Sequence, residues 1–393
     1  MNLTPFLVFL CIFILPITAV ADSSITAIPV LDVRPWSVPS NESIRFNLSL
    51  SPGWNLGNAL DCEDDSITPG VNDMTLDSMW SGMQVSEKTI DTLKQTGFKT
   101  IRIPVSWHNH VLDDAYTINP EWMARVKEIV DWSLDRGLNV IINCHHDIGE
   151  NWIYPTKEKY EQSRSYLVAI WKQIAATFET YDQHLIFEGL NEPRLKGTSV
   201  EWLYSYSDPN CIEATDCINR LNQEFVNTIR AGSGNNPTRY LMVPAYAASP
   251  YTATFNNFVL PEDTAKDRLM VSVHAYIPTD FAMTGSGTDY FDLEDTDQTS
   301  VIDDAFNALY DQYIKRGIPV VIGEFGSTDK HNPRDRVDFT AYYAARAYER
   351  GLTCIIWDNA LFDGYEEVFG LMDRENGTWI EKDIIDTFLT YCK

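Results

Sequence analysis

Eight short apolar or β-branched runs recur along the chain, and longer amphipathic segments follow most of them. The runs are Trp54–Asn58, Thr100–Trp107, Asn139–His146, Leu185–Glu192, Tyr240–Tyr246, Leu269–Tyr276, Val320–Phe325 and Cys354–Asn359. Several are apolar at nearly every position, which is typical of parallel strands buried on both faces. Strands that alternate with helices form a parallel sheet, and eight such units favour a closed (β/α)8 barrel.

The segments between these runs carry the signals of amphipathic helices. In Glu121–Arg136, the side chains of Val126, Ile129 and Val130 fall on one face, and Gly137 stops the segment. The connection after the fifth run, around 258–267, has the weakest helical pattern. Further helices are expected over Ser163–Tyr181, Ile218–Arg230, Ser300–Arg316, Asp335–Arg350 and Lys382–Tyr391.

An open sheet that binds a dinucleotide is disfavoured by the end of the first run. Such a sheet needs G-x-G-x-x-G after its first strand, whereas this chain has Gly57-Asn58-Ala59-Leu60-Asp61. No Pro/Ser/Thr-rich linker is found. We therefore expect one α/β domain, a (β/α)8 TIM barrel over residues 53–393, preceded by a short N-terminal strap over residues 22–52.

The first 21 residues have the pattern of a secretory signal peptide. They contain no charged side chain, Phe6–Leu15 is apolar, and Ala19-Val20-Ala21 places small residues at a cleavage site. A membrane anchor is the alternative, but the apolar run is about half of the ~20 residues that a span requires. We therefore expect a secreted, extracellular protein with no membrane partner after cleavage of residues 1–21.

The net charge argues against one class of partner. The 393 residues include 56 Asp and Glu against 30 Lys and Arg, so the formal net charge is −26. Binding to phosphates requires an excess of Lys and Arg, which disfavours nucleic acid and an anionic membrane surface as partners. The chain is expected to act as a monomer.

Covalent modification is expected at two kinds of site. Cys11 lies in the signal, which leaves six cysteines, and an even count in an exported chain suggests disulfides. Cys211 and Cys217, six apart in what reads as a polar loop, are the favoured pair. In a eukaryotic source, the candidate glycosylation sites are Asn41, Asn47 and Asn376.

Polar side chains gather where the apolar runs end. The chemistry of such a barrel sits at the C-terminal ends of its strands, and ionisable groups that end apolar strands are costly unless they serve a site. One such end is compatible with a satisfied polar group of the core, but seven separate ends are not explained by packing. These ends carry Asn58, Arg102, Trp107, His145, His146, Asn191, Glu192, His274, Tyr276, Glu324, Trp357 and Asn359.

Glu192 and Glu324 end the fourth and seventh runs, on roughly opposite sides of the expected barrel mouth. Two carboxyl groups about 5–5.5 Å apart cleave a glycosidic bond with retention, provided that one is protonated and the other ionised. Donors on Arg102 and Tyr276 would favour the ionised form of Glu324, whereas Glu192 is expected near His145. We therefore assign Glu192 as general acid/base and Glu324 as nucleophile. The alternative is a pair of solvated carboxylates at loop starts.

The segment Leu185–Arg194, with the sequence LIFEGLNEPR, resembles the signature of glycoside hydrolase family 5 cellulases. Further motifs in that family's order are Gly53–Asn58, Arg102–Val105, His145-His146, His274–Tyr276, Gly323–Gly326 and Trp357–Asn359. Phe369–Arg374 favours the endo-glucanase and xyloglucanase branch, and the resemblance runs from about Pro52 to the C-terminus. The resemblance implies catalysis by Glu192 and Glu324 in a subsite lined by Arg102, His145, Asn191, His274, Tyr276 and Trp357.

The supporting residues also have other interpretations. His145-His146 suggests a metal site, but adjacent strand residues point to opposite faces and no H-E-x-x-H motif is present. We therefore expect no metal and no cofactor. His274 and Tyr276 are two apart and share a face, and Trp357 would give a flat platform for a sugar ring. The expected substrate-binding set is completed by Asn58, His146 and Asn191, whose amide suits a sugar 2-hydroxyl.

These observations lead to one hypothesis and three alternatives. The hypothesis is a secreted, retaining endo-β-1,4-glucanase whose partner is a β-glucan polysaccharide, with xyloglucan or mixed-linkage glucan as further substrates. Within the same fold, the alternative is an endo-mannanase or a xylanase. An inactive carbohydrate-binding barrel and a metal-dependent hydrolase are the alternatives from other classes.

Overall fold

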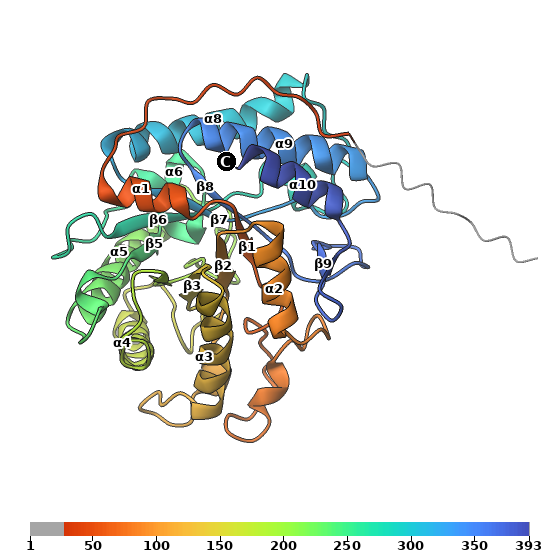
Figure 1. Cartoon of the computed structure of the whole chain (residues 1–393). Coiled ribbons are helices and arrows are strands. Elements are labelled where there is room, and N and C mark those ends of the chain that lie inside the picture. The colour runs from red at the N-terminus through yellow and green to blue at the C-terminus, as the bar shows by residue number, and fades with distance from the viewer. Residues whose placement is uncertain (1–26, 393) are drawn as a thin grey trace, which may run out of the picture.

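The computed structural model describes residues 27–392, whose eight parallel strands close into a barrel (Figure 1). Each strand pairs with the next, and β1 closes the circle by pairing with β8 through Gly53 with Ile355 and Trp54 with Ile356. The strands are β1 Gly53–Asn55, β2 Thr100–Ile103, β3 Asn139–Asn143, β4 Leu185–Glu188, β5 Leu241–Pro244, β6 Leu269–His274, β7 Val320–Phe325 and β8 Thr353–Ile356. The predicted (β/α)8 fold is confirmed. The predicted signal peptide, residues 1–21, lies outside the described residues.

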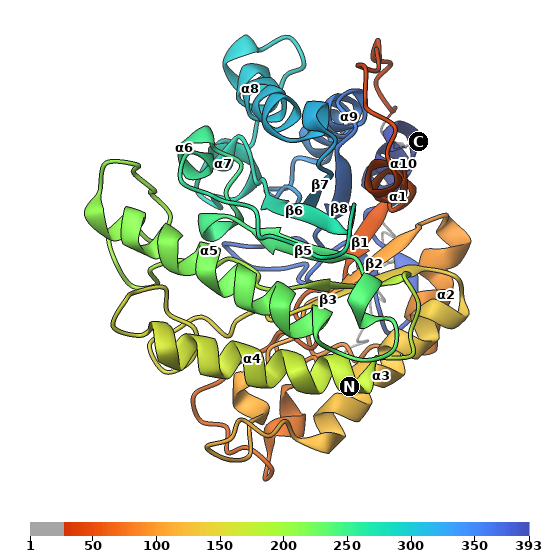
Figure 2. The ribbon, with the colours of Figure 1, turned by 90° about the vertical axis from the view of Figure 1, so that its left-hand side faces the viewer.

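Helices surround the barrel on its outer face, as Figures 1 and 2 show. They are α1 Glu42–Ser49, α2 Glu87–Thr96, α3 Pro120–Asp135, α4 Tyr160–Thr177, α5 Pro209–Arg230, α6 Thr252–Phe255, α7 Thr279–Ala282, α8 Thr296–Gln312, α9 Pro333–Glu349 and α10 Lys382–Tyr391. Short 3-10 turns are η1 Asp73–Leu76, η2 His108–His110, η3 Asn236–Thr238, η4 Tyr246–Ala248 and η5 Ile314–Arg316, and β9 Met372–Asp373 pairs antiparallel with β10 Thr378–Trp379. The only α-helix between β5 and β6 is the four-residue α6, so this connection is the least helical, as expected.

Helix α5 begins nine residues earlier than the sequence pattern predicted. Asp208 accepts a hydrogen bond from the amide of Asn210, and Pro209 occupies the first turn, so a capped helix start precedes the expected Ile218. The predicted disulfide is wrong for the same reason. Cys211 and Cys217 both lie in α5, where six residues separate them by about 9 Å along the axis, beyond the roughly 7 Å that a disulfide spans. All six cysteines of the described residues are free and buried.

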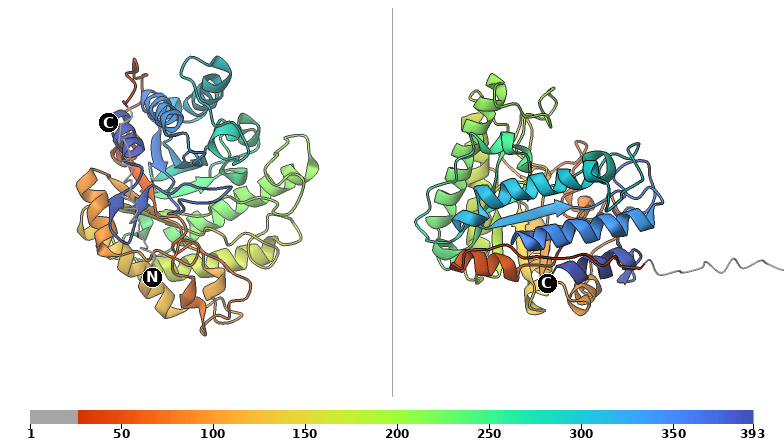
Figure 3. Two further views of the ribbon diagram at one scale, coloured as in Figure 1. Left: turned by 90° about the vertical axis from the view of Figure 1, so that its right-hand side faces the viewer. Right: turned by 90° about the horizontal axis from the view of Figure 1, so that it is seen from above.

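The segment before β1 runs along the outside of the barrel and then passes beneath it. Residues 27–41 are extended, as the right-hand view of Figure 3 shows, and the amide of Trp36 donates to the carbonyl of Glu349. Helix α1 follows, with Phe46 stacked on Tyr240 at 3.9 Å between ring centroids. Leu50, just after α1, is fully buried against the barrel interior. This segment therefore covers the N-terminal end of the barrel, opposite the strand ends that carry the polar residues.

The three glycosylation candidates differ in accessibility. Asn47 is fully buried in α1, and its side-chain amide donates to the carbonyl of Val320. A glycan on Asn47 is incompatible with this packing, so that prediction is wrong. Asn41 is half-buried and caps α1, and Asn376 is exposed. Modification at these two positions stays a prediction.

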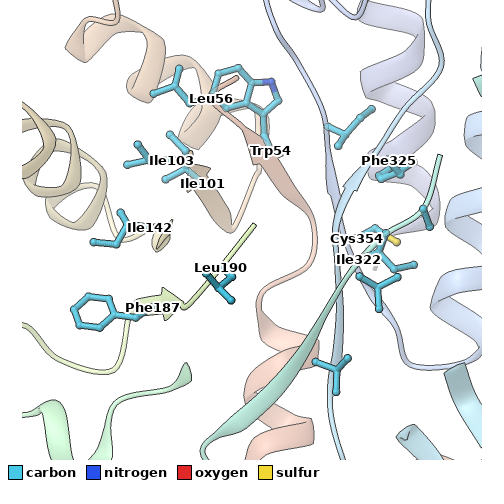
Figure 4. Close-up of a cluster of buried hydrophobic side chains, with 14 of the residues drawn as sticks. Trp54, Leu56, Ile101, Ile103, Ile142, Phe187, Leu190, Ile322, Phe325 and Cys354 are labelled. Atoms are coloured by element: carbon cyan, nitrogen blue, oxygen red, sulfur yellow. The ribbon is translucent and has the colours of Figure 1, made fainter. Parts of the chain in front are cut away.

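Strand alternation divides the core into two layers. Figure 4 shows part of the outer layer, in which Ile101, Ile103, Ile142 and Phe187 pack with the surrounding elements. The residues between them point into the barrel. There Leu50, Ile141, Ile186, Tyr240, Met242, Met270, Val321 and Ile355 form a separate apolar cluster. No helix within residues 27–392 is long and apolar enough to cross a membrane.

Candidate active site

A layer of polar side chains lies directly above the apolar interior of the barrel. Asn143, Glu188 and Ser272 each lie two positions beyond an interior residue of their strand, so they face the same way. Asn55 of β1 and Arg102 of β2 complete the layer, and all five are fully buried. Only Arg102 was among the predicted site residues. The other four were not predicted because they lie before the ends of the apolar runs, although strand alternation places them on the interior face.

Arg102 connects this layer to the residues above it. Its Nε donates to Oε2 of Glu188 at 2.7 Å, and Nη1 donates to Oδ1 of Asn55 at 3.0 Å and to Oε1 of Glu324 at 2.8 Å. Nη2 donates to Oδ1 of Asn191 at 2.7 Å and approaches Nε2 of His274 at 3.4 Å. Burial lowers the pKa of Arg102, but the charges of Glu188 and Glu324 outweigh burial and raise it overall. The guanidinium therefore stays charged and fixes four neighbours.

Glu188 is the buried counter-charge of Arg102. Its Oε2 also accepts from the amide of Asn143 at 3.1 Å, and its Oε1 accepts from the hydroxyl of Ser272. A buried ion pair is stable only when its remaining polar atoms are hydrogen-bonded. Because Asn143 and Ser272 supply those bonds, Glu188 holds Arg102 in place beneath the candidate carboxylates.

Glu192 and Glu324 are brought together across the barrel mouth by His274. Nδ1 of His274 lies 2.7 Å from Oε1 of Glu192 and 3.5 Å from Oε1 of Glu324. One oxygen of each carboxylate and one nitrogen of His274 all lie within 4.8 Å of one another. The hydroxyl of Tyr276 donates to Oε2 of Glu324 at 3.0 Å. The contacts expected for Glu324 with Arg102 and Tyr276 are therefore present.

The pKa shifts of the two carboxyl groups run in opposite directions. Burial raises the pKa of Glu192, but the hydrogen bond and charge of His274 lower it overall. Burial raises the pKa of Glu324, and the charge of Glu192 raises it further, against the lowering effects of His274 and Arg102. From the sequence, the donors around Glu324 were expected to favour its ionised form. The closer contact of His274 with Glu192 than with Glu324 was not predicted.

His145 and Asn191 lie beside this pair. The amide of Asn143 donates to Nδ1 of His145 at 3.1 Å, and the ring of His145 is parallel to Trp357, with 6.0 Å between ring centroids. Burial lowers the pKa of His145 well below its usual range, so its ring is neutral. Nδ2 of Asn191 lies 3.5 Å from Nε2 of His145. His145, Asn191 and Trp357 therefore form one wall of the site.

His145 and His146 do not point to opposite faces of a strand, so that prediction is wrong. Strand β3 ends at Asn143, so strand alternation no longer applies, and the two rings meet edge to face at 4.5 Å. Single ligand atoms of Asp61, His145 and His146 lie within 4.8 Å of one another. The oxygens of Asp61 already accept from the backbone amides of Asn58 and Ala59.

Asn58 and His146 lie at the edge of the site. Asn58 has a φ of 55° and contributes its backbone to a turn, with its carbonyl accepting from the hydroxyl of Ser81. Its side chain has no hydrogen bond to the other predicted site residues within the described part of the chain. Burial lowers the pKa of His146 to about 4, and its ring packs against Trp80 at 5.5 Å. Trp80 was not predicted.

Arg194 is a further residue that the sequence did not single out. Its Nη1 donates to the backbone carbonyl of Glu192 at 3.0 Å and lies 3.6 Å from Oε2 of the same residue. This cation therefore adjoins one of the two candidate catalytic carboxylates. The sequence places Arg194 two residues after Glu192, but it does not predict the direction of the chain after Pro193.

A (β/α)8 barrel in which a half-buried and a buried carboxylate, Glu192 and Glu324, approach each other at the C-terminal ends of the strands has the arrangement that glycoside hydrolases use. Residues 63–363 match the model of the cellulase family, glycosyl hydrolase family 5. The chain belongs to this family, and the resemblance seen in the sequence is confirmed.

Relatives and solved structures agree with that assignment. The chain is 42% identical over 346 residues to Endoglucanase 1 of Ruminococcus albus, covering 88% of this chain and 80% of that one. It is 39% identical over 343 residues to Endoglucanase B of Neocallimastix patriciarum, covering 86% and 68%. A family 5 lichenase variant from Caldicellulosiruptor sp. F32 in complex with cellotetraose superposes with a TM-score of 0.91 at 40% identity, covering 94% and 100%. A broad-specificity endoglucanase from Ruminococcus champanellensis with bound cellotriose gives 0.83 at 38% identity, covering 90% and 100%.

Proposed function

We propose that this chain is a secreted endo-β-1,4-glucanase that hydrolyses internal bonds of β-glucans with retention of configuration. Glu324 is the nucleophile and Glu192 the general acid/base. The observation that carries the proposal is that one oxygen of each carboxylate and one histidine nitrogen all lie within 4.8 Å of one another. Inverting enzymes separate their carboxyl groups by about 6.5–9.5 Å to admit a water molecule, so the short spacing supports retention.

In the first step, a carboxylate oxygen of Glu324 attacks the anomeric carbon and forms a glycosyl–enzyme ester. The bond between that carbon and the glycosidic oxygen breaks, and Glu192 donates its proton to the departing oxygen. In the second step, Glu192 takes a proton from water, the resulting hydroxide attacks the same carbon, and the carboxylate of Glu324 leaves. Both oxygens of Glu324 have fixed donors, Arg102 on Oε1 and Tyr276 on Oε2, which orient the attack.

The opposite pKa shifts of the free site are compatible with these roles because the two groups influence each other. The charge of Glu192 contributes to the raised pKa of Glu324. When a proton occupies Glu192, that charge disappears, and Arg102 and His274 then favour the ionised form of Glu324. The reactive form therefore has a protonated Glu192 and an ionised Glu324.

Three neighbouring side chains suit one sugar ring of the substrate. Trp357 offers an apolar ring face of the kind that packs on pyranose C–H bonds, with the neutral ring of His145 parallel to it. Oδ1 of Asn191 is occupied by Arg102, so its Nδ2 is the group that remains to donate to a sugar 2-hydroxyl. That contact strengthens in an oxocarbenium-like transition state.

The substrate is a β-1,4-glucan or a mixed-linkage β-glucan. Similar proteins are named endoglucanases and a lichenase, and two of the similar structures contain cellotetraose or cellotriose. These names favour glucan over mannan or xylan. The complete carboxylate pair with its donors disfavours the inactive binding protein. Secretion by a signal over residues 1–21 and action as a monomer belong to the same proposal.

Hydrolysis assays on a substrate panel test this function. We expect release of reducing ends from carboxymethylcellulose and mixed-linkage glucan, and little from mannan or xylan. Glu192→Gln and Glu324→Gln should each lower the rate by about 10²-fold or more, whereas Glu87→Gln, an exposed acid of α2, should not. Proton NMR of the first product should show the β-anomer. Near-normal rates in either active-site variant, or an α-anomer first, would refute the proposal.

A further inference from the structure

Arg194 is held on three sides beside Glu192. Its Nε lies 3.1 Å from Oε1 of Glu201, its Nη1 donates to the carbonyl of Glu192, and its guanidinium carbon lies 3.9 Å from the ring centre of Trp202. Cation–ring contacts and ion pairs together restrict a long side chain that would otherwise have many rotamers. The guanidinium is therefore fixed before any substrate arrives.

The loop that carries these partners is itself anchored. The amide of Leu195 donates to the hydroxyl of Tyr246 at 3.1 Å, and that hydroxyl donates to the carbonyl of Val200 at 2.8 Å. The amide of Gly197 donates to Oε2 of Glu201 at 2.7 Å. Tyr246 is fully buried. Arg194 therefore lies in a loop whose conformation is fixed by hydrogen bonds to Tyr246 and Glu201.

The two oxygens of Glu192 face different neighbours. Oε1 lies 2.7 Å from Nδ1 of His274, which also lies near Glu324. Oε2 has no hydrogen bond within the described part of the chain, and its nearest cation is Nη1 of Arg194 at 3.6 Å. Oε1 therefore faces the nucleophile, whereas Oε2 is the oxygen that is open to carry the acid proton.

We propose that Arg194 is a positioning residue for the general acid, and that Trp202 beside it forms a sugar platform on the leaving-group side of the site. The inference rests on the proposed function of Glu192. The departing oxygen receives its proton from Glu192. The leaving sugar therefore lies next to Glu192, on the side of the site opposite to Glu324. Trp202 packs on Arg194 beside Glu192 and is 58% exposed, and an exposed indole face suits the apolar face of a glucose ring.

Arg194 acts on Glu192 together with other charged and titratable groups. Those that face Glu192 are His274 and Tyr276 from the end of β6, Glu324 from β7, His146 from the loop after β3, and Glu367 from the loop after β8. Among the cations, Arg194 follows His274 in lowering the pKa of Glu192. Removing Arg194 should therefore raise that pKa. Because the acid must be protonated, the basic limb of the pH–rate profile should move to higher pH.

Arg194→Gln and Arg194→Lys test the inference when kcat/KM is measured against pH. With cellotetraose, we expect Arg194→Gln to shift the basic limb upward by roughly one pH unit, and Arg194→Lys to restore most of the wild-type profile. With a dinitrophenyl β-cellobioside, whose leaving group needs no proton, Arg194→Gln should change the rate little. Trp202→Ala should raise KM for cellotetraose several-fold and leave the aryl cellobioside unaffected.

Arg220→Gln is the matched control. Arg220 also packs on an aromatic ring, at 3.6 Å from the ring centre of Tyr160, but it lies in α5 away from the carboxylates. Its profile should coincide with that of the wild type, and thermal unfolding should show that all variants fold. An unshifted basic limb in Arg194→Gln, or equal losses on both substrates, would overturn the inference while leaving the proposed function intact. A wild-type protein without glucanase activity would instead refute the proposed function.

Discussion

Arg102 and Glu188 form an ion pair that solvent does not reach, with Nε of the arginine 2.7 Å from Oε2 of the glutamate. The pair lies one layer below Glu192 and Glu324, the proposed catalytic carboxylates. The same guanidinium donates to Glu324 at 2.8 Å. The position of Glu324, the proposed nucleophile, is therefore fixed by a buried charge pair beneath it.

Glu188→Gln should destabilise the protein because it leaves the buried Arg102 with half of its counter-charge. Breaking one partner of a buried ion pair costs roughly 3–5 kcal/mol, and urea unfolding measures the loss. Glu87→Gln removes the exposed partner of Arg136 and should cost less than about 1 kcal/mol. Equal effects of the two variants would show that Glu188 has no special structural role.

His110 should contribute to loss of stability in acid. It is fully buried, stacks on Trp122 at 3.6 Å and pairs with Asp73, and burial lowers its pKa to about 4. Between pH 6.5 and 4, the unfolded chain takes up a proton at this residue that the folded chain does not. Stability therefore falls as pH falls, by at most roughly 3 kcal/mol for this group. In His110→Gln the fall in unfolding free energy between pH 7 and 4.5 should be smaller; an identical fall would contradict the assignment.

Gly57→Ala should displace the ring of Trp357, the proposed platform for a sugar ring beside His145 and Asn191. A Cβ atom at this position would lie 2.5 Å from the indole of Trp357, so the ring must move. We expect KM for cello-oligosaccharides to rise by about tenfold, since roughly 1.4 kcal/mol of ring packing is at stake. Gly149→Ala is the control, because a Cβ there meets nothing within 4 Å. Unchanged kinetics in Gly57→Ala would argue against Trp357 as a platform.

The cysteines of the described residues should all titrate as thiols. Without a reducing agent, the folded protein should react slowly with a thiol reagent, since all six are buried. In the denatured protein, six thiols per chain should react with the reagent. A count of four would mean that two of these six cysteines are joined by a disulfide.

The barrel and the two carboxylates were predictable because both depend on local patterns. Apolar runs give the strands, and polar residues at their ends give the site. Glu188 lies in the segment Leu185–Arg194, but its ion pair with Arg102 was not predicted. The two residues lie 86 positions apart and meet only when the barrel closes. The start of α5 was missed because its first turns are polar, although Asp208-Pro209 is a readable helix start.

Other features depend on distances that no sequence pattern contains. The direction of the pKa shift at Glu192 follows from where Nδ1 of His274 lies, and the contact of His145 with His146 follows from where β3 ends. The position of Arg194 beside Glu192 depends on its contacts with Trp202 and Glu201, which only the folded loop brings together.

Covalent trapping of the nucleophile tests the central claim most directly. A 2-deoxy-2-fluoro β-cellobioside with a dinitrophenyl leaving group should form a glycosyl ester that hydrolyses slowly, because the fluorine destabilises the transition state of the second step. Peptide mass spectrometry of the inactivated protein should then find one fluorocellobiosyl group on Glu324. An inactivated protein labelled on another residue, or rapid turnover of the reagent without any adduct, would contradict the assignment of Glu324.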